Sequence, residues 1–499
     1  MKNYLKLLVL GLVCALSVTS CTPFDELDTD PNRATSVPSS LLLAGVLKDM
    51  TQGENSPWSD AQRDNQFWVI SFDYYGDQDY NWGSADFKYS VLSNIEAMAK
   101  ETQDLDTKNK YEAIAKFLKA YYYDFMSRRL GDIPLSEALQ AISENNIQKP
   151  AYDSQKEVYL QILTWLEEAN TQIAEAQKEI GTGDVQGDFF YKGDLTKWQK
   201  AINSFHLRIL INLSKKATEL EVAKRFQKIV NDPVTYPVFE SNADNMIRVY
   251  GNEQNNFYTW NPGNRGFNRN RNIMGATYLN LLKDRKDPRI YVVADPAASL
   301  YDNNEPQNLD AYVGAKTGAE QGPMQVASDN GLLSYPSNER YYDDYTGQPN
   351  ILMSYAELEF NIAEAANRGW INQSAQDHYE KGIKASMGIY NIAEENVAKY
   401  LAQNSVIYAG NNTMGLEQIL TQKYIAFFNN SGRESYFNYR RTGIPTFDIG
   451  PANKNEGKIP LRWKYPQSEY QNNEQNVKAA IYSQYNGTDD INATMWLIE

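Results

Sequence analysis

Apolar residues recur at the spacing of an α-helix in several long stretches of this 499-residue chain. In residues 111–130 the apolar side chains from Ile114 to Met126 form one continuous stripe, and Gly131 and Pro134 follow it. A stripe of this kind favours a helix with one buried face, and Gly followed by Pro is the expected stop. The same periodicity predicts helices at residues 87–99, 156–179, 195–213, 352–367, 375–390 and 416–428. The pattern therefore predicts a mainly α-helical fold.

Most of these stretches lie in adjacent pairs, which indicates a repeated unit. Residues 351–368 and 374–390 are separated by a short turn, and Ala375, Tyr379 and Ile383 occupy positions typical of a helical repeat. Such pairs are the unit of tetratricopeptide-like packing, whose period is about 34 residues. The chain shows no strict period of that kind, so an irregular helical domain is the alternative. We expect a tetratricopeptide-like scaffold of helical pairs.

The helical pattern breaks in two places. Between about residues 231 and 350 the chain is rich in Asn, Gly, Pro and Tyr, with short β-like stretches at residues 246–250 and 289–293. Residues 442–499 have a similar composition and are expected to wrap around the helices. Long ordered loops commonly serve binding. We therefore expect one helical domain over residues 39–499 that carries a loop-rich ligand-binding face.

The N-terminus has the pattern of an export signal with a lipidation cysteine. Lys2 and Lys6 precede an apolar run over residues 7–18, and Cys21 follows shortly afterwards. Because the run is shorter than the roughly 20 residues that cross a bilayer as a helix, it favours a cleaved signal peptide. The expected segments are a signal peptide at residues 1–20 and an acylated, flexible spacer at residues 21–38. The alternative is a secreted protein in which Cys21 is an unmodified thiol.

The composition disfavours several classes of function. The chain has 48 basic and 63 acidic residues and a formal net charge of −15, which argues against nucleic acid as a partner. Its two histidines, His206 and His378, leave no paired ligands at metal spacing and no evident partner for a nucleophilic serine. The sequence also lacks a P-loop and a dinucleotide-binding glycine motif. We therefore expect no catalytic residue, no metal and no cofactor.

Three alternatives stay open. A glycoside hydrolase needs only two carboxylates, and acidic residues are plentiful in this chain. A structural surface protein or adhesin needs no small ligand at all. A structural calcium ion would have to use residues such as Asp73, Asp77, Asp79 and Asp86, but their spacing is not that of an EF-hand and does not support it.

Three aromatic-rich stretches are candidates for ligand binding, because flat rings beside amides and carboxylates suit a sugar ring or a peptide. The first stretch, residues 72–82, offers Tyr74, Tyr75, Asp77, Asp79, Tyr80, Asn81 and Trp82; the second, residues 256–272, offers Tyr258, Trp260, Asn261 and Arg265; the third, residues 335–345, offers Arg340, Tyr341 and Tyr342. We expect at least two of these stretches to converge on one site. The alternative is that the loops pack their aromatic residues inward, as Tyr and Trp commonly do.

Several motifs, spread over nearly the whole chain after Cys21, resemble those of one known family. They are FDELDTDPN at residues 24–32, AIAK at 113–116 with GDIPLSEAL at 131–139, GDLTKW at 193–198, YAELEF at 355–360, QKYIA at 422–426 with RRTG at 440–443, and IPLR at 459–462 with YPQSEY at 465–470. In order and coverage they are similar to the SusD/RagB family of nutrient-binding outer-membrane lipoproteins.

This resemblance implies a SusD-like fold and a receptor rather than an enzyme. It further implies a lipid-anchored location at the outer membrane, facing the cell surface. There the protein would capture an oligosaccharide or peptide and deliver it to a SusC-like TonB-dependent barrel. The motifs at residues 131–134 and 440–443 are interpreted as packing and turn devices. No ligand residue is carried over from the family, so the three aromatic stretches rest on their chemistry alone.

Overall fold

Helices predominate in the computed structural model, which describes residues 37–71, 78–102, 108–141, 143, 145–181, 185–268 and 271–499. The chain divides into units of residues 1–38 and 39–499, and the helices and strands of the described residues belong to the second unit. Within the described ranges, none of the helices combines the length and hydrophobicity that crossing a membrane requires. Cys21, the predicted signal peptide and the spacer up to residue 36 lie outside the described residues.

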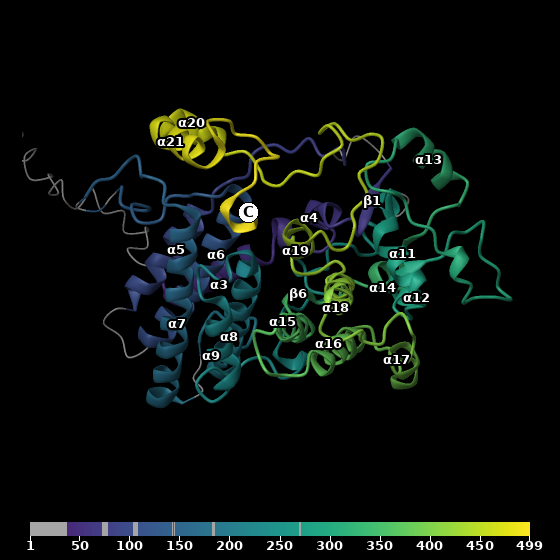
Figure 1. The fold of residues 1–499 in the computed structure, drawn as a ribbon, viewed down its shortest axis with the longest axis horizontal. Coiled ribbons are helices and arrows are strands. Elements are labelled where there is room, and N and C mark those ends of the chain that lie inside the picture. Colours follow the sequence, from purple (N-terminus) through teal and green to yellow (C-terminus); the bar gives the residue numbers. More distant parts are fainter. Residues whose placement is uncertain are drawn as a thin grey trace, which may run out of the picture. The chain divides into compact units, whose positions relative to one another are not determined.

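The first half of the second unit is a group of long helices that pack on one another. α6 packs along α7, α7 along α8, and α3 along α5, as Figure 1 shows. The helices are α3 (Ser39–Met50), α4 (Asp60–Asp64), α5 (Tyr89–Glu101), α6 (Lys108–Leu130), α7 (Gln155–Ile180), α8 (Leu195–Asn212) and α9 (Val222–Asn231). Local capping defines two of their starts. Ser154 and Glu157 form a capping box before α7, and the Asp194 carboxylate accepts backbone N–H groups before α8.

A second group of helices follows in the C-terminal part of the chain. α15 packs against α16 and α18 and also contacts α8, so it joins the two groups. The helices are α15 (Tyr355–Asn367), α16 (Ala375–Ile389), α17 (Glu394–Leu401), α18 (Thr413–Ala426), α19 (Glu434–Thr442), α20 (Gln467–Asn472) and α21 (Glu474–Tyr485). The predicted mainly α-helical fold of paired helices is confirmed. α20 and α21 were not predicted; α21 forms because Val477, Ile481 and Tyr485 recur on one buried face.

The loop-rich middle of the chain contains short elements. Three two-stranded antiparallel sheets pair β1 (Trp68–Ile70) with β3 (Asn272–Met274), β2 (Met246–Arg248) with β6 (Asn350–Met353), and β4 (Ala294–Asp295) with β5 (Tyr335–Pro336). The short α-helices are α10 (Arg265–Asn268), α11 (Ala276–Asp284), α12 (Ile290–Val293), α13 (Gln321–Asp329) and α14 (Asn338–Tyr342). The 3₁₀ helices along the chain are η1 (Gly53–Asn55), η3 (Leu213–Lys216), η4 (Asn242–Asp244), η5 (Leu309–Ala311) and η6 (Trp496–Ile498).

The two β-like stretches predicted in this region have different outcomes. Residues 246–248 form β2, as predicted, whereas residues 290–293 form the helical turn α12, so the second prediction is wrong. The Asp287 carboxylate accepts hydrogen bonds from the backbone N–H and the Nε of Arg289, at 3.0 and 2.9 Å. Both side chains are fully buried. This ion pair begins a helical turn in which the N–H of Val293 donates to the carbonyl of Arg289, and it overrides the β preference of the apolar residues.

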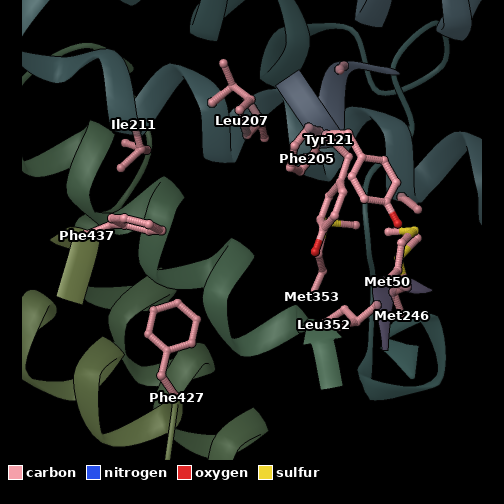
Figure 2. Packing of buried hydrophobic residues seen from close by; sticks show 14 of the residues in the cluster. Met50, Tyr121, Phe205, Leu207, Ile211, Met246, Leu352, Met353, Phe427 and Phe437 are labelled. Atoms are coloured by element: carbon pink, nitrogen blue, oxygen red, sulfur yellow. The ribbon is translucent and has the colours of Figure 1, made fainter. Parts of the chain in front are cut away.

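One hydrophobic core joins the two helical groups and the middle region. In the close-up of Figure 2, Tyr121 of α6 and Phe205 of α8 lie beside Leu352 and Met353 of β6 and Met246 of β2. The rings of Tyr121 and Phe205 have centroids 5.9 Å apart. Because strands of the middle region supply part of this core, the loop-rich segment is held against the helical scaffold.

The motifs at residues 131–134 and 440–443 lie at helix ends. Gly131 has φ +95°, and a Cβ there would lie 2.2 Å from the side-chain oxygens of Gln484 and Tyr485, so only glycine fits. Gly443 ends α19 in the left-handed conformation, with φ 76°. The Nη1 of Arg441 lies 2.5 Å from the Oε1 of Glu364 in α15. These motif residues therefore serve packing, as interpreted from the sequence.

Candidate functional site

The second and third aromatic stretches converge on each other in the interior. The ring of Trp260 stacks on that of Tyr342, with centroids 5.1 Å apart and 12° between the planes. It also stacks on Trp58, with centroids 3.7 Å apart and an angle of 11°. Trp260 is 5% exposed and Tyr342 is 3% exposed. The two stretches come together in the core and not on an open ligand site, because these rings present no open face to a ligand.

Tyr258 and Tyr341 belong to the same interior cluster and are fully buried. The Nε1 of Trp58 donates a hydrogen bond of 2.8 Å to the Oη of Tyr258, and Tyr341 packs edge-on against the Trp58 ring at 4.8 Å. The side-chain amide of Asn261 donates to the Tyr258 carbonyl at 2.9 Å. The alternative that the loops pack their aromatic residues inward therefore holds for this part of the chain. The expectation that a ligand stacks on the rings of Tyr258, Trp260, Tyr341 and Tyr342 is wrong, because these rings are buried.

The two cations predicted beside these rings differ in their surroundings. The Nε of Arg340 donates to the Oε1 of Gln348 at 3.1 Å, and its guanidinium lies 4.8 Å from the centroid of Tyr390. These contacts give Arg340 a structural role. Arg265 is half-buried in α10, and its ligand role remains a prediction.

The first aromatic stretch is described from Gln78 onward. Tyr74, Tyr75 and Asp77 lie outside the described residues, and their ligand roles remain predictions. Tyr80 is buried; its Oη accepts a hydrogen bond of 2.7 Å from the Nε2 of Gln66 and donates one to the Asp448 carbonyl. Burial raises the pKa of the Tyr80 phenol. Tyr80 therefore fastens the stretch to the body and offers no face to a ligand.

Two polar residues of this stretch lie at the surface of a small hollow. Gln78 and Asp79 line a space of about 300 Å³ together with Lys454 and residues 318–321. The Nζ of Lys454 lies 2.7 Å from the Oδ2 of Asp79. The backbone N–H of the exposed Asn81 donates to the Oδ1 of Asp79 at 3.1 Å. Asp79 and Asn81 thus form a polar turn beside this hollow.

Trp82, the last residue of the stretch, is half-buried and packs on a partner from the other end of the chain. Its ring stacks on that of Trp463, with centroids 4.2 Å apart and 20° between the planes, and Tyr436 meets it at 5.0 Å. Trp463 was missed from the sequence, because nothing local links two residues so far apart. Its sequence signal is its position between the IPLR and YPQSEY motifs.

Trp463 also lines a larger hollow of about 520 Å³, the aromatic hollow. Its walls come from the end of α3, η1, the start of α5, the C-terminal half of α6 and the C-terminal stretch. The lining residues are Asp49, Gln52, Gly53, Glu54, Asn55, Ser84, Ala85, Asp86, Phe87, Lys88, Ser90, Val91, Tyr122, Phe125, Arg129 and Trp463. The first aromatic stretch therefore ends where this hollow begins.

Charged and aromatic groups alternate along the walls of the aromatic hollow. The Nζ of Lys88 lies 3.2 Å from the Oδ1 of Asp49, whose Oδ2 accepts a hydrogen bond of 2.9 Å from Tyr122. The guanidinium carbon of Arg129 lies 3.5 Å from the ring centroid of Phe125. These pairs keep the polar side chains in defined positions, which is the preorganisation that ligand binding requires.

Glu54 is the carboxylate at the centre of the charges in this hollow. Burial alone would raise its pKa, but the guanidinium groups of Arg129 and Arg433 outweigh burial and lower the pKa of Glu54 to about 2. Glu54 is therefore ionised at neutral pH. A glycoside hydrolase needs a protonated carboxylic acid beside its substrate, and Glu54 cannot be that acid.

Several groups on the walls are available to a ligand. Gln52, Asp86 and Ser90 are exposed, and their side chains make no hydrogen bond to other described residues. Phe87 and Phe125 are half-buried and packed on the core. Open amide, carboxylate and hydroxyl groups beside aromatic rings suit the hydroxyls and apolar faces of a sugar.

The described residues provide no candidate metal centre. Among them, no group of three or more His, Cys, Asp or Glu side chains is arranged to hold a metal ion. Asp73 and Asp77 of the considered calcium cluster lie outside the described residues.

Comparison with known proteins gives a consistent result. A family model described as "Starch-binding associating with outer membrane" matches residues 31–466. Similar solved structures include two SusD homologs from Bacteroides fragilis, at 32% and 30% identity and TM-scores of 0.84 and 0.81, each covering 93% of this chain and 100% of the other. A chitin-binding SusD homolog from Flavobacterium johnsoniae, at 22% identity and a TM-score of 0.71, covers 92% of this chain and 97% of its own and shares the fold. Comparison with curated proteins gave no match.

Proposed function

The chain belongs to the SusD-like family of outer-membrane-associated binding proteins, and from this membership we propose that it captures oligosaccharides and passes them to a SusC-like TonB-dependent barrel. The family is one of carbohydrate-binding proteins, not of enzymes. The observation that carries the proposal is the aromatic hollow, in which the half-buried rings of Phe87 and Phe125, together with the edge of the buried Trp463, lie beside open polar side chains.

The proposed site has the chemistry of a neutral sugar site. Pyranose rings present hydroxyls at their edges and apolar C–H groups on their faces, and the hollow pairs aromatic rings with Gln52, Asp86 and Ser90. The small hollow beside Asp79 and Asn81 is a candidate extension for the other end of an oligomer. Peptide ligands remain the alternative.

Calorimetric titration of the chain with maltohexaose, chitohexaose and a peptide mixture tests this proposal. We expect saturable binding of an oligosaccharide and no release of reducing ends. The double variant Gln52→Ala/Asp86→Ala should weaken that binding about tenfold, because each lost hydrogen bond to a ligand contributes about 0.5–1.5 kcal/mol.

The matched control is Gln471→Ala/Asp284→Ala, which changes an exposed glutamine and an exposed aspartate outside the hollow. Equal affinities of the two double variants would place the ligand elsewhere. Turnover of an oligosaccharide would make the protein an enzyme, and binding of peptides alone would change the ligand class.

We further propose that Cys21 carries the acyl anchor that holds the protein at the outer membrane. Acyl chains bind lipid through their buried methylene groups. The variant Cys21→Ala should therefore yield a folded protein that no longer fractionates with membranes, whereas Thr22→Ala should fractionate as the parent does. Unchanged membrane association of Cys21→Ala after detergent-free washing would contradict acyl anchoring, and failure of the membrane-bound parent to co-purify with a TonB-dependent barrel would contradict delivery.

A further inference from the structure

A second large hollow of about 730 Å³ lies on different elements from the aromatic hollow, and we call it the basic hollow. It is bounded by one face of α3, residues 189–197 before and within α8, residues 243–249 around β2, and residues 255–256. Four cationic side chains line it, those of Lys48, Lys192, Lys197 and Arg248, and no aspartate or glutamate is among its lining residues. In a chain with 63 acidic and 48 basic residues, such a concentration of positive charge is notable.

None of these four cations is paired with a carboxylate of the described residues. Lys48 and Lys192 are exposed, and their ammonium groups form no hydrogen bond or ion pair with another described residue. The Nζ of Lys197 donates to the Ala243 carbonyl at 3.0 Å, and the Nη1 of Arg248 donates to the Oγ1 of Thr51 at 3.2 Å. Both partners are neutral groups that leave the positive charge uncompensated.

The arginines of the interior, unlike the cations of the basic hollow, are paired with carboxylates. Arg128, Arg208 and Arg441 lie in the core, and each is matched with a glutamate at hydrogen-bonding distance. Like charges around one hollow repel each other, so the basic hollow does not stabilise the fold through its cations. A bound anion would offset that repulsion, which gives the cluster a function.

The other walls of the basic hollow are apolar and amide groups. Phe189 is 40% exposed and meets Phe190 edge-on at 4.8 Å, which leaves a ring face open. Val249 is 62% exposed. The side-chain amides of Asn255 and Asn256 make no hydrogen bond to other described residues. An open ring, free amides and unpaired cations together match a sugar oligomer that carries acidic groups.

We propose that the basic hollow is a second binding site, selective for anionic oligosaccharides whose carboxylate or sulfate groups meet Lys48, Lys192, Lys197 and Arg248. The inference rests on the proposed function, because it assumes that the protein binds oligosaccharides, and it adds a site and a ligand class. A concave site with amide groups favours an oligomer over a flat lipid surface. Binding there would depend steeply on salt, since exposed charge pairs are screened.

Titration of the full chain with hexagalacturonate, and in parallel with the neutral maltohexaose, tests the inference. We expect hexagalacturonate to bind at about 50 mM salt and to lose most of its affinity at about 500 mM salt. Lys48→Gln/Lys192→Gln should weaken hexagalacturonate about tenfold and leave maltohexaose unchanged, because two exposed charge pairs contribute at most about that factor. Both lysines are exposed and neither forms a hydrogen bond or ion pair with a described residue, so the variant should fold normally.

The matched control is Lys381→Gln/Lys399→Gln, which removes two exposed lysines of α16 and α17. The inference is overturned if this control weakens hexagalacturonate binding as much as Lys48→Gln/Lys192→Gln does. It is also overturned if Gln52→Ala/Asp86→Ala, and not the lysine variant, abolishes hexagalacturonate binding. A third contradicting result is that polyglutamate or anionic vesicles bind the basic hollow as tightly as hexagalacturonate does. Binding of maltohexaose without any binding of hexagalacturonate would contradict this inference alone. If none of hexagalacturonate, maltohexaose and chitohexaose binds, the proposed function is contradicted as well.

Discussion

The aromatic residues in the loops of this protein are either buried or partly open, depending on the side chains that surround them. Trp260 stacks on Trp58 and Tyr342 and is almost fully buried. Trp82 is of the same residue type but is half-buried, since Trp463 covers one side of it. A large ring gains more free energy by burial than most side chains do, so a Trp in a loop serves the core unless the surrounding chain leaves part of it open.

Trp260→Ala should lower the free energy of unfolding by about 3–5 kcal/mol, because it deletes a large buried ring and leaves a cavity. Urea unfolding followed by circular dichroism measures the change. Tyr482→Ala, which removes a ring that is 75% exposed, should stay within about 0.5 kcal/mol of the parent. Equal unfolding midpoints for the two variants would show that the interior cluster does not support the fold.

Helices that lie far apart in the sequence are held together by buried ion pairs. Glu434 at the start of α19 accepts hydrogen bonds of 2.9 and 2.6 Å from the guanidinium of Arg128 in α6. Arg208 of α8 lies 3.8 Å from the same carboxylate and also pairs with Glu357 of α15. Burial opposes ionisation of Glu434, but the two guanidinium groups hold its pKa well below the usual range. One carboxylate thus connects three helices.

Glu434→Gln should destabilise the fold by about 1–3 kcal/mol, because an amide cannot accept both hydrogen bonds of Arg128, while Arg128 keeps Asp124 and Arg208 keeps Glu357 as counter-charges. Glu456→Gln, which affects an exposed pair with Lys458, should change stability by less than about 1 kcal/mol. Since the pKa of Glu434 is lowered by folding, its stabilisation is complete above the ordinary glutamate value of 4.5 and is lost as the pH falls below it. The parent should therefore lose more stability than the variant between about pH 4.5 and pH 2, and parallel thermal unfolding curves would contradict this role.

The C-terminal stretch packs against the end of α6 and lines the aromatic hollow. The C-terminal stretch contributes Trp463 to the aromatic hollow, and the Oη of Tyr485 donates to the Leu130 carbonyl at the end of α6 at 2.8 Å. Arg462 is fully buried and pairs with Asp489 at 2.6 Å. The final residues therefore contribute to the stability of the whole molecule and to the shape of the proposed site.

Removal of residues 489–499 should destabilise the chain by more than about 3 kcal/mol, because Arg462 loses its carboxylate partner Asp489 and the buried Met495 and Leu497 are lost. The same truncation should weaken maltohexaose binding, because loss of the Arg462–Asp489 pair should displace the neighbouring Trp463, which lines the aromatic hollow. Removal of Glu499 alone should change neither property. Thermal unfolding and calorimetry on both truncated chains measure the effects, and an unaltered unfolding midpoint of the longer truncation would refute them.

The sequence alone determined the helical scaffold and the family, because apolar periodicity and motif order can be read along the chain without knowing which residues are in contact. It did not determine which aromatic residues face a ligand. Trp82 and Trp463 come together only through tertiary packing, and residues 290–293 form a helix because Asp287 and Arg289 pair in the interior. Likewise, the four cations of the basic hollow are scattered along the sequence. Burial and charge neutralisation depend on neighbours that distant segments supply, and only the tertiary structure brings those neighbours into contact.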